Sequence, residues 1–258
     1  MQLYIDIGNT NIVLGFREND EWYQIHRISS GEESAFIEGS IEMVTRKFAQ
    51  LRFSEIISIT VSSVVPRLTT VIRKILKKFF PAYNAKKFLL VNPKIYNKLN
   101  VTITTNKSEI GTDLVANAVA GFEYAKSACI VVDFGTALTF TIIDNYGNIQ
   151  GVNIAPGIKT AMKALIGSTA QLSEIPLELP DSIIGKNTVH AIQSGMLYGY
   201  VGLVKGMLEG IKQELNQDCK VIATGGLSNV LEPLNDEFDL IDMQLTLNGL
   251  VLIENLVY

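Results

Sequence analysis

Residues 3–16 read LYIDIGNTNIVLGF, and residues 130–143 repeat the same pattern as IVVDFGTALTFTII. Each segment is an apolar run, then Asp-x-Gly with a threonine close behind, then a second apolar run. Runs rich in Val and Ile on both sides of a glycine-containing turn predict a β-hairpin. The chain therefore contains two copies of one hairpin, and this repeat decides the fold.

The distance between the two copies indicates a duplicated domain. Asp6 and Asp133 occupy the same position in each copy and lie about half of the 258-residue chain apart, too far for a solenoid repeat. We therefore predict an α/β fold of two duplicated domains, each with a mixed sheet flanked by helices. Their expected ranges are 1–115 and 116–258, joined within the helix that follows Asp113.

Apolar periodicity and turn residues give the expected elements. Pro66 suits the first position of a helix, which we expect to run to about residue 80. The second half repeats the strands of the first and continues with a helix, a strand and a helix. Strands are expected at 2–8, 11–17, 21–27, 56–62, 87–91, 128–133, 137–144 and 149–154, and further helices at 36–50 and 187–215.

Composition and charge exclude several classes of protein. The chain is 47% hydrophobic and 19% charged, as is typical of a globular protein. A net charge of −4 and a pI near 5.3 give no basic field to attract nucleic acid. No signal-peptide pattern is present, and the uncharged stretch 191–204 is too short and glycine-rich to cross a bilayer. We expect a cytoplasmic protein that binds neither nucleic acid nor membrane.

The cysteines and histidines do not form a metal-binding pattern. Cys129 and Cys219 both adjoin apolar strands, so we expect buried thiols in a reducing compartment. His26 and His190 are isolated in the sequence. Structural metal binding by these residue types is not expected.

The residues of the two hairpin turns suit a triphosphate with its magnesium. Glycine lets backbone amides approach a ligand closely, and small hydroxyls add donors. An aspartate at the strand end can hold a hydrated cation, which prefers oxygen ligands. For either copy alone, an ordinary hairpin turn is the better explanation. Two copies in matching halves favour a ligand site.

A third glycine segment follows a later strand. Residues 220–226 read KVIATGG, in which Thr224, Gly225 and Gly226 end an apolar run. Glycines at this point allow an adenosine to lie flat against the backbone, although many strand-to-helix turns look alike. The sequence 185–188 lacks the glycine spacing of a Walker A loop, and no G-x-G-x-x-G follows a strand. We therefore expect a phosphate site made by two hairpins.

Glycines recur along the long helix expected over 187–215. Each costs up to about 1 kcal/mol in a helix relative to alanine, so their number requires a reason. Close packing against another helix, including one from a second subunit, is one explanation. Packing within its own domain is the other, and the sequence leaves both open. The glycines lie three or four residues apart, at Gly195, Gly199, Gly202, Gly206 and Gly210.

Eight segments in a fixed order carry a resemblance to a known family. They are DIGNTNIVLG at 6–15, SSVVP at 62–66, GTDLVANAVAG at 111–121, VVDFGTALT at 131–139, APGI at 155–158, GKNT at 185–188, ATGGL at 223–227 and LTLNGL at 245–250. Over essentially its whole length the chain resembles the type III pantothenate kinases of the acetate and sugar kinase/heat-shock protein 70/actin superfamily. The resemblance implies two actin-like (ribonuclease H-like) domains.

The resemblance also implies an activity and its partners. The reaction is transfer of the ATP γ-phosphoryl group to the primary hydroxyl of pantothenate, which gives 4′-phosphopantothenate in the first committed step toward coenzyme A. The enzymes of this family use Mg²⁺ and a monovalent cation such as K⁺ or NH₄⁺, and they form homodimers. ATP is the co-substrate.

The resemblance also implies roles for the residues that match the family motifs. Asp113 is implied as the catalytic base, Asp6 as the residue that places Mg²⁺ through water, and Asp133 as a ligand of the monovalent cation. ATP is implied to contact Asp6, Ile7, Gly8, Asn9, Thr10, Asn11, Ile12, Val13, Thr136, Gly225 and Gly226. Substrate is implied to contact Gly111, Thr112, Asp113, Leu114 and Thr188.

Two of these positions also have a structural interpretation. Asp113 precedes an apolar helical run, and from the sequence alone an N-cap is the better explanation for it. A carboxylate also suits a phosphoryl-transfer site, which needs positioning and a base near the attacking hydroxyl, and both roles can coexist. Thr188 can cap the long helix near Asn187 instead of reaching substrate across a dimer.

The chain departs from the family where the acceptor is expected to bind. Leu114 stands where the family has an arginine that grips the substrate carboxylate, and Thr104 stands where it has a tyrosine. Either another basic side chain, with Lys107 and Lys159 as candidates, takes over, or the pocket prefers another alcohol. A nucleotide-binding accessory factor for transcription is the alternative without kinase activity.

Overall fold

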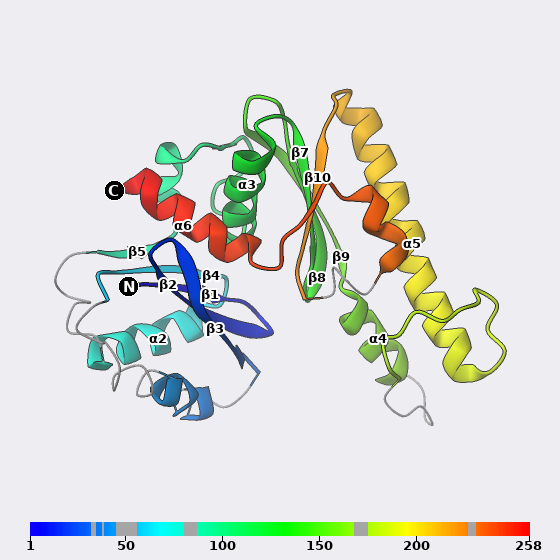
Figure 1. Ribbon diagram of the computed structural model, residues 1–258, viewed down its shortest axis with the longest axis horizontal. Coiled ribbons are helices and arrows are strands. Elements are labelled where there is room, and N and C mark those ends of the chain that lie inside the picture. Colours follow the sequence, from blue (N-terminus) through cyan, green and yellow to red (C-terminus); the bar gives the residue numbers. More distant parts are fainter. Residues whose placement is uncertain (32–34, 38, 45–55, 80–86, 168–174, 227–230) are drawn as a thin grey trace. The chain divides into compact units, whose positions relative to one another are not determined.

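The computed structural model describes all residues except 32–34, 38, 45–55, 80–86, 168–174 and 227–230 (Figure 1). Its contacts divide the chain into two compact units. Unit 1 comprises Met1–Asn100, Asn106–Ala120 and Thr246–Tyr258, and unit 2 comprises Val101–Thr105 and Gly121–Leu245. Among the described helices, none is both long and apolar enough to cross a membrane.

Unit 1 is built on a five-stranded mixed sheet. The strands are β1 (Gln2–Ile7), β2 (Asn11–Glu18), β3 (Glu21–Ser29), β4 (Ser58–Ser63) and β5 (Phe88–Leu90), in the order β3-β2-β1-β4-β5. The first three strands form an antiparallel meander, and β4 and β5 add in parallel. The first hairpin predicted from the sequence is confirmed.

One face of this sheet packs on an apolar core that includes helix α2 (Pro66–Phe79). Alternate residues of β1 point into this core, and Ile72 and Leu76 of α2 meet them there. Pro66 begins α2 as predicted. The helix expected at 36–50 falls partly outside the described residues, which are helical at 35–37 and 39–44.

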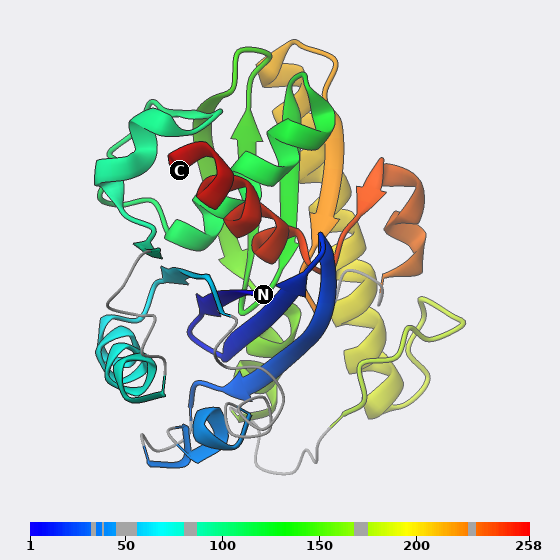
Figure 2. The same cartoon turned by 60° about the vertical axis from the view of Figure 1, so that its left-hand side comes forward.

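Two further helices contribute to unit 1. Helix α3 (Thr112–Ala125) and the C-terminal helix α6 (Leu245–Val257) lie side by side (Figures 1 and 2). Unit 1 contains α3 as far as Ala120 and α6 from Thr246. A methyl group added at Gly249 of α6 would collide with the backbone of Ala116 in α3, so only glycine permits this approach. Thr246 of α6 also donates a hydrogen bond to Asn117 of α3 (2.8 Å).

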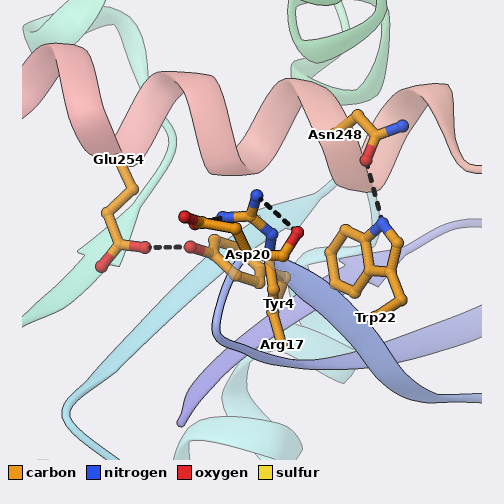
Figure 3. Close-up of polar contacts among 6 residues, drawn as sticks. All are labelled: Tyr4, Arg17, Asp20, Trp22, Asn248 and Glu254. Atoms are coloured by element: carbon orange, nitrogen blue, oxygen red, sulfur yellow. Dashed lines mark hydrogen bonds and ion pairs between the residues drawn. The ribbon is translucent and has the colours of Figure 1, made fainter.

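Helix α6 is tied to the first sheet by buried polar contacts (Figure 3). The hydroxyl of Tyr4 in β1 donates to the carboxylate of Glu254 (2.5 Å), and the indole of Trp22 in β3 donates to Asn248 (3.0 Å). The predicted ranges 1–115 and 116–258 assign α6 to the second half. Its contacts instead place residues 246–258 in unit 1, because the chain returns to the first sheet at its end.

Unit 2 repeats the strand order of unit 1. Its sheet has the order β11-β10-β7-β8-β9-β6, and β7, β8 and β9 form an antiparallel meander to which β10 and β11 add in parallel. The strands are β6 (Thr102–Ile103), β7 (Cys129–Phe134), β8 (Ala137–Ile143), β9 (Asn148–Pro156), β10 (Lys220–Thr224) and β11 (Leu240–Ile241). The predicted duplication of a mixed α/β unit is therefore confirmed.

Helices α4 (Ile158–Gly167) and α5 (Thr188–Leu215) belong to unit 2. Leu197, Val204 and Leu208 of α5 share a core with Ile130 and Phe140 of the sheet. Two short 3₁₀ helices, η3 (Pro93–Lys98) in unit 1 and η4 (Glu232–Glu237) in unit 2, complete the described elements.

Both cysteines are free thiols in unit 2. Cys129 is fully buried in β7, and burial raises the pKa of its thiol to about 12. Cys219 is half-buried. The expectation of buried thiols is therefore confirmed for Cys129 and only partly met by Cys219.

Candidate functional site

The turn of the first hairpin is tight, and hydrogen bonds from Ser30 hold its shape. The amide of Gly8 donates to the carbonyl of Asn11 (2.9 Å). Ser30, at the end of β3, donates its amide to the Thr10 carbonyl (2.8 Å) and its hydroxyl to the Gly8 carbonyl (2.7 Å). Asn9, Thr10 and Asn11 are exposed at the tip. The turn therefore presents backbone and small polar groups in a fixed shape.

The predicted nucleotide contacts of this hairpin divide into two kinds. Ile7, Ile12 and Val13 are buried in unit 1, so only their backbone groups are available to a ligand. Asp6 and Gly8 are half-buried next to the exposed tip. Ser30 was missed by the sequence analysis, because its link to the turn depends on the pairing of β2 with β3.

Strand β4 ends beside the aspartate of this hairpin. Asp6 pairs with Ser62 in the parallel register of β1 and β4, and the amide of Val64 donates to the carbonyl of Ile7 (3.1 Å). Since parallel strands bring their carboxyl ends to one edge of a sheet, Asp6 and Ser62 share that edge. This edge is where an α/β sheet ordinarily binds ligand.

Asp113 lies in the first turn of α3, and the N-cap interpretation is wrong for it. The helix begins at Thr112, and the carboxylate of Asp113 accepts the amide of its neighbour Leu114 (2.8 Å). A side chain at Gly111 would collide with this carboxylate, so glycine leaves the room that it occupies. Burial raises the pKa of the Asp113 carboxyl, opposed by the backbone amides of Leu114 and Asp113.

The hydroxyl of Thr112 is bonded within the protein. It accepts the amide of Ser63 (3.0 Å) and pairs with the hydroxyl of Ser62 (2.9 Å), which is fully buried. These bonds join the start of α3 to the end of β4. SSVVP at 62–66 is one of the motifs that carry the family resemblance, but no role was predicted for its serines. The available signal for such a role was the pair of hydroxyls at the end of a buried parallel strand.

Unit 2 builds its own glycine-lined turn. The amide of Gly135 donates to the Ala137 carbonyl (3.1 Å), and the Thr136 carbonyl accepts from the Gly157 amide (3.0 Å) and the Thr160 hydroxyl (2.7 Å). A methyl group at Gly157 would collide with Gly135 and Thr136. No site role was predicted for Gly157 or Thr160, although APGI at 155–158 is one of the motifs that carry the family resemblance.

Asp133 and the third glycine segment meet in unit 2. Thr224 pairs with Asp133 in the register of β10 and β7. Gly225 has φ +92°, and a methyl group there would collide with the Asp133 carboxylate and the Phe134 backbone. Gly226 is exposed beside it. The structure thus brings together Asp133, Thr136 and Gly225 in unit 2, and Asp6, Ser62 and Thr112 in unit 1.

The donor set fits a magnesium ion that keeps most of its water. Within the described part of the chain, no group of three or more His, Cys, Asp or Glu side chains is arranged to hold a metal. Mg²⁺ commonly uses one or two carboxylates with water and phosphate oxygens, and Asp6 supplies one carboxylate at the edge of the sheet. Asp133 offers a carboxylate close to the backbone of Gly225 in unit 2.

The remaining predicted residues have simple surroundings. Asn187 caps α5 by accepting the His190 amide (2.9 Å), so the cap is not Thr188, which is exposed at the first helical position. The Thr104 hydroxyl donates to the Ile149 carbonyl (2.6 Å). Leu114 is half-buried beside Asp113. The candidate replacements Lys107 and Lys159 are exposed, the first in unit 1 and the second in unit 2.

The glycines of α5 lie on its outer face. A methyl group at Gly195, Gly199, Gly202, Gly206 or Gly210 meets no atom of the described structure within 4 Å. The buried side chains of α5 recur on the opposite face at Leu197, Tyr200, Val204 and Leu208. Packing against the described residues of unit 2 therefore does not explain these glycines.

Solved structures share the fold at low sequence identity. A Baf-family transcriptional activator from Campylobacter jejuni aligns with a TM-score of 0.56 and 19% identity, covering 98% of this chain and 97% of that one. The activator of 2-hydroxyisocaproyl-CoA dehydratase from Clostridium difficile, solved with bound ADPNP, gives 0.51 and 12%, covering 99% and 95%. These likenesses support the actin-like fold.

Sequence comparisons identify the family. A family model described as type III pantothenate kinase matches residues 2–210. The type III pantothenate kinase of Geotalea daltonii is 39% identical over 251 residues, which are 97% of this chain and 96% of the relative. That of Citrifermentans bemidjiense is 38% identical over 254 residues, or 98% of each. The chain therefore belongs to the type III pantothenate kinase family.

Proposed function

We propose that this protein transfers the γ-phosphoryl group of ATP to pantothenate, the first step of coenzyme A synthesis. The observation that carries the proposal is the duplicated Asp-x-Gly hairpin, on β1–β2 and again on β7–β8, in a chain of this family. Phosphoryl transfer depends on positioning and charge neutralisation, and both hairpins offer fixed backbone amides with an aspartate close by. We place the reaction in the cytoplasm, where ATP is available.

The residues of unit 1 supply the parts of a phosphoryl-transfer site. The amides of 9–11 bind phosphate oxygens, in a turn that Ser30 holds in shape. Asp6 holds Mg²⁺ through water, and the ion neutralises phosphate charge when bound. Asp113 accepts the proton of the attacking hydroxyl. A carboxyl whose pKa is raised by burial is a stronger base than an ordinary aspartate, which suits this task.

The residues of unit 2 bind the rest of the nucleotide and a monovalent cation. Thr136 presents its amide and hydroxyl at the second turn, and Gly225 and Gly226 leave flat backbone for the adenosine. Asp133 binds K⁺ or NH₄⁺. Its position under Gly225, where a side chain would displace the carboxylate, supports this assignment.

The protein acts as a homodimer in this proposal. The outer face of α5 carries five glycines that pack on nothing in the described structure, and Thr188 lies on the same helix at its exposed start. Glycines on a helix surface allow the close approach of another backbone. A second copy of the chain would account for the helix-propensity cost of these residues, and it would allow Thr188 to reach substrate in a neighbouring subunit.

The test is pantothenate-dependent release of ADP by the purified protein. The assay contains MgATP and is run in matched KCl, NH₄Cl and NaCl. We expect turnover that requires pantothenate and Mg²⁺ and is greater with K⁺ or NH₄⁺ than with Na⁺. Absence of pantothenate-dependent turnover in all three salts would reject the activity, and equal rates in all three would reject the cation role of Asp133.

A second candidate function is phosphorylation of another small alcohol. Leu114 favours it, because an apolar side chain next to Asp113 provides no charge for a substrate carboxylate. A screen of hydroxyl acceptors, with and without a carboxylate, separates the two candidates. Preference for a neutral acceptor over pantothenate by kcat/KM would establish this second function.

A further inference from the structure

We propose that Thr112 and Ser62 are positioning residues that fix the place of Asp113, an inference that rests on the proposed kinase function. The resemblance to the family implies substrate contact for Thr112 and no role for Ser62. Their contacts in unit 1 indicate instead a buried connection between the catalytic helix and the strand beside the phosphate hairpin. Neither side chain needs to touch a substrate for this role.

The connection consists of two hydrogen bonds that meet at one atom. Oγ1 of Thr112 lies 3.0 Å from the amide nitrogen of Ser63, which donates to it, and 2.9 Å from Oγ of Ser62. Thr112 is the first residue of α3, so the bonds act on the end of the helix. Ser62 and Ser63 pair with Asp6 and Ile7 of β1. These bonds therefore fix the position of the start of α3 relative to the edge of the sheet that carries Asp6.

The backbone around Asp113 leaves its carboxylate little freedom. One oxygen accepts the Leu114 amide at 2.8 Å, and the space next to it is open only because residue 111 is glycine. The amide of Val115 donates to the carbonyl of Gly111 (3.1 Å), which closes the first helical turn around Asp113. A carboxylate held by its own turn moves with that turn. Whatever fixes residue 112 therefore fixes the carboxylate of residue 113.

Burial makes this connection costly to break. Ser62 is 0% exposed, and its hydroxyl and that of Thr112 satisfy each other. Removal of the Thr112 hydroxyl leaves the hydroxyl of Ser62 buried without that partner, which such groups avoid. A contact made only to bind substrate would leave the hydroxyl open to the site. Here both hydrogen bonds of the Thr112 hydroxyl lead back into β4.

The experiment compares Thr112→Val with Thr112→Ser. Valine keeps the shape and removes both bonds, whereas serine keeps the hydroxyl. We expect Thr112→Val to lower kcat by about 10- to 100-fold, as small misplacements of catalytic groups do, with KM for ATP and for pantothenate within about twofold of wild type. Thr112→Ser should restore most of kcat. Thr70→Val, which removes an exposed hydroxyl bonded only to the Pro66 carbonyl, is the matched control.

A second measurement does not depend on turnover. The pKa of Asp113 is followed by carboxyl-carbon NMR, with Asp113→Asn to assign the signal. Loosening of the first turn admits water, so Thr112→Val should lower the raised pKa toward that of an ordinary aspartate, and Thr112→Ser should not. The charge of Asp113 affects the pKa of Tyr96, which lies on η3. Burial, then that charge, raises the pKa of Tyr96 to about 12, so it stays protonated throughout the titration.

The outcomes separate this proposal from the proposed function. If wild type does not phosphorylate pantothenate, the function fails, and the NMR titration still decides the positioning role. An unchanged pKa in Thr112→Val overturns the proposal, and so does a loss confined to KM for pantothenate, which indicates substrate contact. If Thr112→Val does not fold, Ser62→Ala replaces it. That variant keeps the Ser63 bond and should lower kcat by a smaller factor, and wild-type kcat in it overturns the role of Ser62.

Discussion

At the scale of single residues, Asp113 combines a proposed catalytic role with a cost in stability. Its carboxyl is partly buried and has a raised pKa, so its ionised form is disfavoured in the folded state. The free energy of unfolding therefore falls as the pH rises from about 4, the pKa of an unfolded aspartate, through the raised value. Each unit by which the pKa is raised corresponds to about 1.4 kcal/mol.

Asp113→Asn should remove both the activity and the cost. We expect kcat to fall by about 10²- to 10⁴-fold, the usual contribution of a general base, while ATP still binds. At neutral pH the variant should melt at a higher temperature than wild type, and this difference should disappear near pH 4. Thermal melting from pH 4 to pH 8 measures it. A variant no more stable than wild type at pH 7 would contradict the burial argument.

Leu114 is the residue on which we expect acceptor choice to depend. If pantothenate is the substrate and its carboxylate lies near residue 114, Leu114→Arg should lower KM for pantothenate by about 10- to 100-fold, the value of a charge-assisted hydrogen bond. Leu114→Met is the control for side-chain volume. Steady-state kinetics with pantothenate and with a neutral analogue measure the change. An equal change for both acceptors would argue against a carboxylate contact.

At the scale of elements, the C-terminal helix is fixed to the first sheet through polar groups. The Tyr4 hydroxyl and the Glu254 carboxylate are both buried, with 0% and 4% of the residue exposed, and they bond to each other (Figure 3). Burial, with the neighbouring carboxylate, raises the pKa of Tyr4, so its phenol remains the donor at all working pH values. A buried carboxylate that loses its donor is more costly than an apolar pair.

Tyr4→Phe should therefore destabilise the protein by about 1–3 kcal/mol. The double variant Tyr4→Phe with Glu254→Leu should recover part of that loss, because no buried charge remains. Urea unfolding measures both, and Tyr146→Phe on the exposed β8–β9 turn is the control. The loss of stability in the double variant is compared with the sum of the losses in the two single variants. A larger loss in the double variant would show that the carboxylate is stabilised by other groups.

Elements that are specified locally could be predicted, and those specified by distant contacts could not. The hairpins at Asp6 and Asp133 follow from apolar runs on each side of a glycine turn. The return of α6 to β1 depends on a bond between residues 4 and 254, which has no local signal. The N-cap prediction for Asp113 failed because an aspartate before a helical run suits both the cap and the first turn. The Thr112 and Ser30 bonds likewise join residues from separate elements.

At the scale of the whole molecule, assembly is tested on the outer face of α5. Gly202→Glu adds a long charged side chain to this face, where the described structure leaves open space, so the subunit itself should fold normally. If a second copy packs there, the variant should sediment as a monomer while wild type sediments as a dimer. Gly167→Glu, at an equally open glycine at the end of α4, is the matched control. A dimeric Gly202→Glu protein would place the interface elsewhere.

The duplication of one α/β unit gives each unit a glycine turn with an aspartate, and we propose a role in nucleotide binding for each turn in this member of the type III pantothenate kinase family. The carboxylate that we propose as the catalytic base belongs to unit 1, and the residues predicted to contact adenosine and the monovalent cation belong to unit 2.

The most direct test is identification of the product by mass spectrometry and ³¹P NMR after incubation of the protein with MgATP and pantothenate. We predict equal amounts of ADP and 4′-phosphopantothenate from wild type, and at least about 100-fold less of each from Asp113→Asn in the same time. ADP without a phosphorylated acceptor, or the same yield of product from both proteins, would contradict the account.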